Sequence, residues 1–266
     1  MKRTIVCLIA LTLLFAAASA SAKTLKVGME CNYAPFNWTQ SEASEYTVPL
    51  AAGGYADGYD VQVARFIAKE LGMELEIVKT EWDGLPMALS SGKIDAIIAG
   101  MSPTTERKLT IDFSTPYYQS DLVIVVNKGS QYESATRLAD FSGAKITGQL
   151  NTFHYSVIDQ IPGVAKQTAL DTFPAMIVAL SSGRIDGYVS ERPGALSAVA
   201  SNPGFTFVSF PEGEGFVTLE EDTAVAVGLP KGSAMTEQVN AIQEKLDAAT
   251  RIQMMDDAMV RQPLSE

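Results

Sequence analysis

Cysteine and histidine are scarce in this sequence. Its 266 residues contain two cysteines and one histidine. Cys7 lies in the apolar N-terminal stretch, so the rest of the chain keeps only Cys31 and has no internal disulfide framework. We expect Cys31 to be a partly buried free thiol, because the adjacent Glu30 disfavours the reactive thiolate. With His154 as the sole imidazole, no zinc site is predicted, and His154 is assigned a structural or minor pocket-lining role.

Motifs of catalysis and cofactor binding are also absent. There is no Gly-x-Ser-x-Gly nucleophile turn and no Gly-Lys-Ser/Thr phosphate loop, and Gly213-Glu214-Gly215 lacks the third glycine of a dinucleotide-binding loop. We therefore predict no cofactor and no metal. Lysine and arginine number 20 against 31 acidic residues, which gives a net charge of −11. Such an acidic chain repels nucleic acid and anionic lipid, so neither is an expected partner.

The N-terminal residues predict export. Met1-Lys2-Arg3 is followed by an apolar run from Ile5 to Ala18 and by Ala20-Ser21-Ala22, the small-residue pattern of a signal-peptide cleavage site. We predict a signal peptide over residues 1–22 and a mature chain that begins near Lys23. An uncleaved membrane anchor is the alternative. A lipid anchor is not expected, because Cys7 lies inside the signal rather than at the cleavage site.

One octapeptide occurs twice. Residues 88–95 read Ala-Leu-Ser-Ser-Gly-Lys-Ile-Asp, residues 179–186 read Ala-Leu-Ser-Ser-Gly-Arg-Ile-Asp, and an apolar run follows each copy. In each copy we expect a helix to end at the glycine and a buried strand to follow, as in a parallel α/β sheet. Two such units, about 90 residues apart, indicate an α/β protein with two lobes of similar construction.

Hydrophobic patterning predicts the remaining elements. Strands are expected at 25–29 and 75–78, and helices at 61–71, 85–89, 234–246 and 251–260. The stretch 39–57, which contains Pro49 and Gly53-Gly54, is expected to be a loop and a candidate flap over the site. The apolar strands 121–127 and 223–229 are interpreted as the crossings between lobes. The predicted domains are a discontinuous first lobe, 23–121 plus 225–266, and a second lobe, 122–224.

Side chains of opposite charge follow the two repeat strands, at the sheet edge where α/β proteins bind ligands. After the first strand, Arg107 offers a planar fork for a carboxylate, and Ser102 and Thr105 offer hydroxyls and a helix N-terminal N–H. After the second strand, Glu191 offers a carboxylate to an ammonium group. The alternatives are a surface arginine, simple N-caps, and an ion pair between Glu191 and Arg192. The polarity suits a zwitterion held between the lobes.

Aromatic residues lie near the predicted strand ends. Tyr33 and Trp82 are candidates for the walls of a pocket that holds an apolar or cationic group. Phe36 and Trp38 are assigned to the core instead. Glu30 comes one residue after the first strand and is a candidate to meet a basic group.

Several motifs together resemble the periplasmic amino-acid-binding proteins of ABC importers, a family of bacterial solute-binding proteins (family 3). The matching segments are Tyr33-Ala34-Pro35-Phe36, Gly58-Tyr59-Asp60-Val61, Trp82-Asp83-Gly84-Leu85, Gly92–Ser102, Thr104–Lys108 and Asp112–Tyr118. They cover most of the first lobe, whereas the second lobe matches more loosely. The resemblance implies a type II periplasmic binding protein fold, with two lobes, two hinge crossings and the ligand cleft between the lobes.

The resemblance also implies roles at the two charged ends of an amino acid. Arg107, helped by Ser102, would bind the ligand carboxylate, and Thr152 would close on it from the second lobe. The carbonyl of Gly100 and the carboxylate of Glu191 would bind the ammonium.

At the side-chain end, the resemblance implies that Tyr33 and Trp82 flank the ligand and that Glu30 lies at its far end. This arrangement favours a cationic ligand such as lysine, arginine or ornithine, and a small or neutral polar amino acid is the alternative. The family often has Gly-Thr where this chain has Asn151-Thr152, and aspartate where it has Glu191.

The predicted function is the amino-acid-binding component of an ABC importer, a non-enzymatic protein of the periplasm. It would close on a free α-amino acid and deliver it to a membrane permease, and a monomer is expected. Periplasmic dehydratases acting on prephenate or arogenate resemble the same fold and are the enzymatic alternative. The sensor lobe of a receptor is a third possibility.

Overall fold

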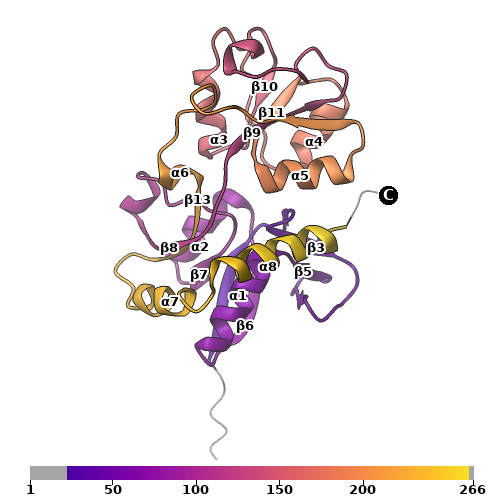
Figure 1. Cartoon of the computed structure of the whole chain (residues 1–266). Coiled ribbons are helices and arrows are strands. Elements are labelled where there is room, and N and C mark those ends of the chain that lie inside the picture. The colour runs from indigo at the N-terminus through magenta and orange to yellow at the C-terminus, as the bar shows by residue number, and fades with distance from the viewer. Residues whose placement is uncertain (1–22, 264–266) are drawn as a thin grey trace, which may run out of the picture.

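The computed structural model describes residues 23–263, which form two lobes, each built on its own β-sheet (Figure 1). The first lobe has a five-stranded sheet in the order β6-β1-β7-β13-β8. Its strands are β1 (Thr24–Met29), β6 (Glu74–Lys79), β7 (Ala96–Ile97), β8 (Ile111–Gln119) and β13 (Ala224–Pro230). β1 is parallel to β6 and β7, whereas β13 is antiparallel to β7 and β8. The predicted signal peptide lies outside the described residues.

The second lobe has a four-stranded sheet in the order β10-β11-β9-β12. Its strands are β9 (Leu122–Asn127), β10 (Ile146–Thr147), β11 (Gly187–Glu191) and β12 (Phe205–Val208). Five of the six residues of β9 are buried. Because both faces of this strand are covered, every position can be apolar, which is why the run at 121–127 predicted a strand correctly.

The chain passes between the two sheets twice. It leaves the first sheet after Gln119 and enters the second at Leu122, and it returns between Val208 and Ala224 (Figure 1). The first passage follows β8 and the second leads into β13. These two strands pair along their length, so the two passages lie side by side. The predicted two-lobed α/β class is confirmed.

Both octapeptide copies adopt the predicted helix–turn–strand conformation. α2 (Leu85–Ser90) leads through Gly92 into β7, and α4 (Phe173–Ser181) leads through Gly183 into β11. The two glycines have φ angles of +73° and +71°, the left-handed conformation that ends a helix.

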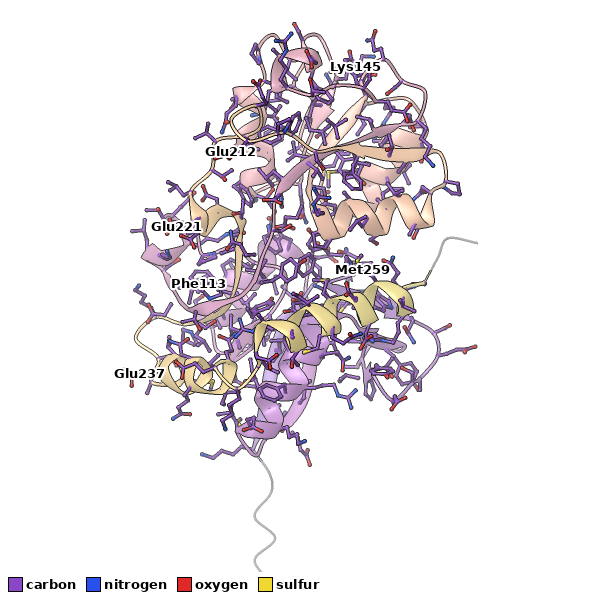
Figure 2. The ribbon with its side chains drawn as sticks, viewed as in Figure 1. Phe113, Lys145, Glu212, Glu221, Glu237 and Met259 are labelled. Atoms are coloured by element: carbon purple, nitrogen blue, oxygen red, sulfur yellow. The ribbon has the colours of Figure 1, made fainter. Side chains whose placement is uncertain are left out.

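The aspartate at the end of each copy makes the same contact. Asp95 Oδ2 accepts from the backbone N–H of Lys26 at 2.8 Å, and Asp186 Oδ2 accepts from that of Lys145, also at 2.8 Å. Figure 2 shows Lys145 at the end of the second lobe remote from the first lobe. Each copy therefore fixes the start of a neighbouring strand, far from the cleft.

The segment 39–57, which was predicted to be a loop, belongs to a small antiparallel sheet that spans residues 32–57. Its strands, in the order β2-β3-β5-β4, are β2 (Asn32–Tyr33), β3 (Asn37–Gln40), β4 (Val48–Pro49) and β5 (Tyr55–Asp57). Strands of two to four residues are too short to give an alternating pattern, so the sequence did not indicate them. Arg261 of α8 (Ala248–Arg261) binds Asp57 at 3.1 Å and lies 4.0 Å from the Tyr46 ring centroid, so α8 anchors this sheet.

α1 (Tyr59–Glu70) shows how local sequence positions the first lobe. Its buried stripe of small and branched apolar residues was predicted, but the helix begins two residues earlier, directly after Gly58. Gly58 has φ of +133°, and a Cβ there would lie 2.2 Å from the carbonyl oxygen of Phe36. Only glycine fits this close approach.

The other helices are short. They are η1 (Trp82–Gly84), η2 (Arg107–Leu109), η3 (Leu138–Phe141), α3 (Phe153–Ser156), η4 (Val157–Gln160), α5 (Arg192–Ser201), α6 (Glu220–Thr223) and α7 (Met235–Gln243). Among residues 23–263, no helix combines the length and the apolar character that a membrane crossing needs.

Candidate functional site

A small cavity lies between the two lobes. Both lobes line it, which suits a ligand that bridges them. The lining residues are Tyr33, Trp82, Ala99, Gly100, Ser102 and Arg107 from the first lobe, and Gln149, Thr152, Phe153, His154 and Phe173 from the second. Six of the nine predicted site residues are among them; Glu30, Thr105 and Glu191 are not.

Arg107 is held at the cavity by main-chain oxygens of both lobes. Its Nη1 donates to the Ser102 oxygen at 3.0 Å, and its Nη2 donates to the Asn151 oxygen at 3.1 Å. The guanidinium carbon lies 5.1 Å from the centroid of the Trp82 ring, a cation–π distance. Burial lowers the pKa of Arg107 to about 10, so the guanidinium is charged at neutral pH. It can therefore bind a carboxylate.

Gly100 and Ser102 form the floor of the cavity beside Tyr33. Gly100 has φ of +65°, and a Cβ there would come within 3.0 Å of the Tyr33 ring. Ser102 is buried. Behind Gly100, the buried Asp60 accepts hydrogen bonds from Tyr117 at 2.7 Å and from Asn37 at 2.8 Å. Burial raises the pKa of Asp60 to about 7.

Glu191 is fully buried where β11 ends and α5 begins. The Tyr33 hydroxyl donates to its Oε2 across the lobes. Its Oε1 lies 3.6 Å from His154 Nε2 and has no hydrogen-bond partner among the described residues. Glu191 thus lies directly behind two lining residues, Tyr33 and His154, with one oxygen available to a cation.

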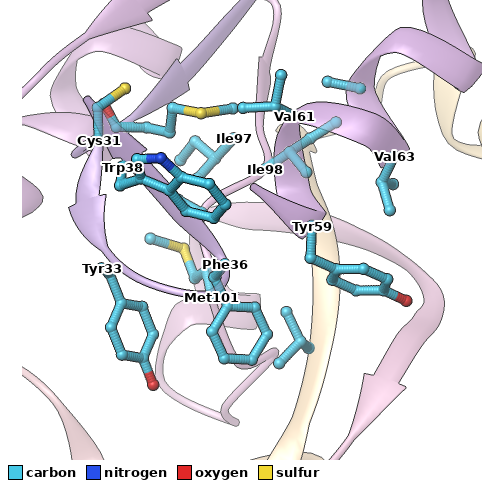
Figure 3. Packing of buried hydrophobic residues seen from close by; sticks show 14 of the residues in the cluster. Cys31, Tyr33, Phe36, Trp38, Tyr59, Val61, Val63, Ile97, Ile98 and Met101 are labelled. Carbon is cyan, nitrogen blue, oxygen red and sulfur yellow. The ribbon is translucent and has the colours of Figure 1, made fainter. Parts of the chain in front are cut away.

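Tyr33 is stacked between two other rings. Its centroid lies 5.0 Å from that of Phe36 and 4.1 Å from that of Phe173 on the second lobe. Figure 3 shows the rings of Tyr33 and Phe36 close together. Burial, and then the charge of Glu191, raise the pKa of the Tyr33 hydroxyl, so it remains a hydrogen-bond donor. These stacked rings make one wall of the cavity.

Glu30 lies behind the cavity and contacts the second lobe. It is 4% exposed, and Gln149 Nε2 donates to its carboxylate at 3.2 Å and to the Asp171 oxygen at 3.1 Å. Burial raises the pKa of Glu30 to about 7, and the charges of Glu81 and Asp83 act in the same direction.

Of the two threonines predicted to bind the ligand, Thr152 lines the cavity and Thr105 does not. Thr152 lines the cavity, and its hydroxyl donates to the Gln149 oxygen at 2.7 Å. Thr105 is exposed, and its hydroxyl donates to Glu221 Oε1 at 2.5 Å, outside the cavity. The structure thus places Thr105 in a surface contact rather than with Ser102 and Arg107, because the chain turns away from the cleft before η2.

Four further residues match or refine the sequence-based assignments. Phe36 and Trp38 are buried, as predicted for the core. Cys31 is free and more deeply buried than expected, and burial raises the pKa of its thiol to about 12. His154 lines the cavity, the second of the two roles proposed for it.

Sequence reasoning missed Gln149, Phe153 and Phe173. Gln149 and Phe153 flank the predicted Thr152, and Phe173 opens the helix of the second repeat copy, one residue after the N-cap Thr172. The available signal was the position of Phe173 at the start of the repeat helix. This helix leads back to a strand that ends at the cleft, so its first residue also lies at the cleft.

Comparison with known proteins identifies relatives along nearly the whole chain. Residues 25–258 match the family model for bacterial extracellular solute-binding proteins, family 3. A probable histidine-binding protein of Campylobacter jejuni is 37% identical over 73% of this chain and 70% of its own length. The L-cystine-binding protein TcyJ of Escherichia coli is 32% identical over 77% of this chain and 71% of its own.

Solved structures agree with this assignment. An amino acid ABC transporter substrate-binding protein from Streptococcus pneumoniae, bound to L-arginine, has a TM-score of 0.78 and 30% identity, covering 89% of this chain and 94% of that one. An ancestral arginine-binding protein bound to arginine has a TM-score of 0.72 and 32% identity, covering 88% and 97%. The predicted type II binding-protein fold and the non-enzymatic class are thereby confirmed. This chain belongs to the bacterial extracellular solute-binding proteins of family 3.

Proposed function

We propose that the protein is the amino-acid-binding component of an ABC importer and captures a free α-amino acid between its lobes. The position of two opposite charges carries the proposal. Arg107 lines the cavity from the first lobe, and the buried Glu191 contacts two lining residues from the second. The relatives are described as binding histidine, cystine or arginine, which are all α-amino acids.

Each charged end of the ligand has a matching group. Arg107 binds the carboxylate through its guanidinium fork, with the Ser102 hydroxyl beside it and Thr152 closing from the second lobe. The Gly100 carbonyl and the free oxygen of Glu191 bind the ammonium. A ligand with both groups neutralises both sites, whereas a simple acid or amine neutralises only one.

The buried carboxyl of Glu30 supports a cationic ligand side chain. The groups that act on its pKa are Gln149, Asn32, Glu81 and Asp83, and none of them is positively charged. A buried carboxylate without a cation is unfavourable, so a guanidinium or ammonium from the ligand would stabilise it. Tyr33 and Trp82 would flank the methylene groups of such a side chain. Lysine, arginine or ornithine fits this arrangement.

Closure would move the lobes as two units, 23–121 plus 225–266 and 122–224. The two passages of the chain between the sheets would act as the hinge. A ligand that contacts both lobes favours the closed state by its differential affinity. We further propose that residues 1–22 direct export to the periplasm, and that the closed monomer delivers its ligand to a membrane permease.

Isothermal titration calorimetry tests the proposal. Protein that has been unfolded and refolded to remove carried-over ligand is titrated with an amino-acid panel that includes L-arginine, L-lysine, L-ornithine, L-histidine, L-cystine and L-glutamine. L-Citrulline is added because it has the shape of arginine with a neutral side chain. Arg107→Ala should abolish binding, whereas Arg184→Ala, an exposed arginine in the second repeat, should not.

Three outcomes are informative. Binding of arginine much tighter than citrulline, lost in Arg107→Ala, supports the proposal in full. Equal binding of the two removes the role of Glu30 and the cationic preference but leaves amino-acid binding. Failure of the folded protein to bind any member of the panel contradicts the proposed function.

A further inference from the structure

The only histidine of the chain lies at the ligand cavity, next to Glu191. Its side chain is 7% exposed, and its Nε2 lies 3.6 Å from Glu191 Oε1. Within residues 23–263, neither ring nitrogen of His154 has a hydrogen-bond partner, and neither does Glu191 Oε1. Buried polar groups are normally paired, so this arrangement requires an explanation.

The surroundings of His154 leave Glu191 as its polar neighbour. Phe153 lies 4.5 Å from the imidazole between centroids, and Phe173 lies 6.1 Å away, edge to face. The Tyr33 hydroxyl takes the other carboxylate oxygen, Oε2. Oε1 therefore faces the imidazole, and this same oxygen is the proposed acceptor for the ligand ammonium.

The other titratable groups around α3 do not replace this pair. Tyr188 lies on β11, the same strand as Glu191, and is fully buried. On η4, Asp159 is exposed and forms an ion pair with Lys166 at 2.9 Å. Beyond these, Tyr155 follows His154 on α3 and packs against Lys166, and Arg107 faces the same cavity from the first lobe.

We propose that His154 is part of the ammonium subsite, where its imidazolium holds Glu191 Oε1 until the ammonium of an amino acid replaces it. This inference rests on the proposed role of Glu191. The imidazolium and the ligand ammonium would meet at the same oxygen and repel each other, so they compete. When the ammonium arrives, the Nε2–H bond breaks, its electron pair stays on Nε2, and the proton passes to the solvent.

This competition links binding to pH. At a pH where His154 is protonated, a bound amino acid displaces that proton, so affinity falls as the pH is lowered, towards a limit of about tenfold per pH unit. The effect acts through the ammonium, so it applies to neutral and cationic amino acids alike. A ligand that lacks the α-ammonium escapes it.

The single histidine makes the proton directly observable. In tag-free protein labelled with ¹³C-histidine, the imidazole gives one signal, which can be followed by NMR from about pH 5 to pH 8, the range in which histidine titrates. We expect saturating L-arginine to move the midpoint of this titration to lower pH. Glu191→Gln should move it to lower pH without ligand. A signal that does not titrate, or that has the same midpoint with and without ligand, overturns the proposal.

Calorimetry in buffers of different ionisation enthalpy counts the released protons. L-Arginine and L-citrulline are compared at about pH 6. His154→Gln should release about one proton fewer than wild type with either ligand. Glu30→Gln should reduce the count with arginine only, which separates the two groups. An unchanged count in a folded His154→Gln that still binds overturns this inference alone. If arginine does not bind, the panel member that does takes its place, and absence of all binding overturns the proposed function as well.

Discussion

The Arg107 guanidinium donates a hydrogen bond of 3.1 Å to the main-chain oxygen of Asn151, across the cleft between the lobes. Asn151 has φ of +55°, a left-handed conformation that asparagine tolerates better than most residues. Its Nδ2 donates to Asp83 Oδ1 at 2.8 Å, and its main-chain oxygen lies 3.5 Å from Trp82 Nε1. One residue of the second lobe thus contacts three residues of the first.

Asn151→Gly should weaken ligand binding although Asn151 does not line the cavity. Glycine keeps the left-handed backbone but removes the hydrogen bond to Asp83, which holds the lobes closed. The bond is exposed, so we expect a loss of about 1 kcal/mol, or about fivefold in Kd, measured by calorimetry.

A double-mutant cycle isolates the contact between Asn151 and Asp83. Asp83→Ala alone should weaken binding by a similar factor, and the double variant should be little worse than either single one. Fully additive effects would mean that the two side chains do not act through each other, and the lobe-closing role of Asn151 would be rejected.

The preference for arginine over citrulline should increase with pH. The pKa of Glu30 is raised to about 7 by burial, and a bound guanidinium favours its ionised form. Arginine binding therefore releases a proton from Glu30, whereas citrulline binding does not. Between about pH 5 and pH 8 the Kd of citrulline divided by the Kd of arginine should rise, by up to about tenfold per pH unit below pH 7. Glu30→Gln should give a ratio that is independent of pH; a pH-dependent ratio in this variant would assign the effect elsewhere.

Stability of the ligand-free protein should fall as the pH rises from about 5 to about 8. Asp60 and Glu30 have folded-state pKa values of about 7, above their ordinary values, so the folded protein binds more protons than the unfolded chain in this window. The unfolding free energy then decreases with pH, by about 2.5 kcal/mol for each group and about 5 kcal/mol in all over the range. Urea denaturation followed by circular dichroism measures it.

Two variants assign this slope. Asp60→Asn should reduce it, because the buried group no longer titrates. Asp112→Asn should leave it unchanged, since the pKa of Asp112 is lowered by Lys231 and its protonation falls below the window. A stability that increases from pH 5 to pH 8 would contradict the raised pKa of Asp60.

A matched pair of glycines tests the close approach at the start of α1. Gly58→Ala places a Cβ 2.2 Å from the Phe36 carbonyl oxygen, and Gly72→Ala meets nothing within 4 Å, while both have positive φ. We expect the first to lower the unfolding free energy by about 3 kcal/mol or more and the second by about 1 kcal/mol. Equal losses would mean that backbone conformation alone, and not the contact with Phe36, requires glycine at position 58.

The repeat made the architecture predictable, because each copy contains the residues that indicate a helix, its end and the strand that follows. A helix, a left-handed glycine, an aspartate and an apolar strand follow one another within about 20 residues, and the residues of the copy itself indicate each of them. The same property explains why Arg107 and Glu191 could be proposed as site residues, since each follows one of the two repeat strands.

Residues whose position depends on the second lobe could not be placed from the sequence. Gln149 reaches Glu30 and Phe173 stacks on Tyr33 across the contact between the two lobes, and no local pattern encodes that contact. Thr105 is the opposite case. Its spacing from Ser102 and Arg107 was suitable, but the chain direction after Pro103 carries its side chain to Glu221 instead.

The deep burial of Cys31 has a practical consequence. A thiol that is 2% exposed, with a pKa of about 12, scarcely reacts with maleimides at neutral pH. Cysteines introduced at Met87 on α2 and Val178 on α4, which are 75% and 65% exposed on different lobes, would therefore be labelled selectively while the native thiol stays in place. A fluorophore pair at these positions would report optically on the proposed closure of the lobes around the ligand.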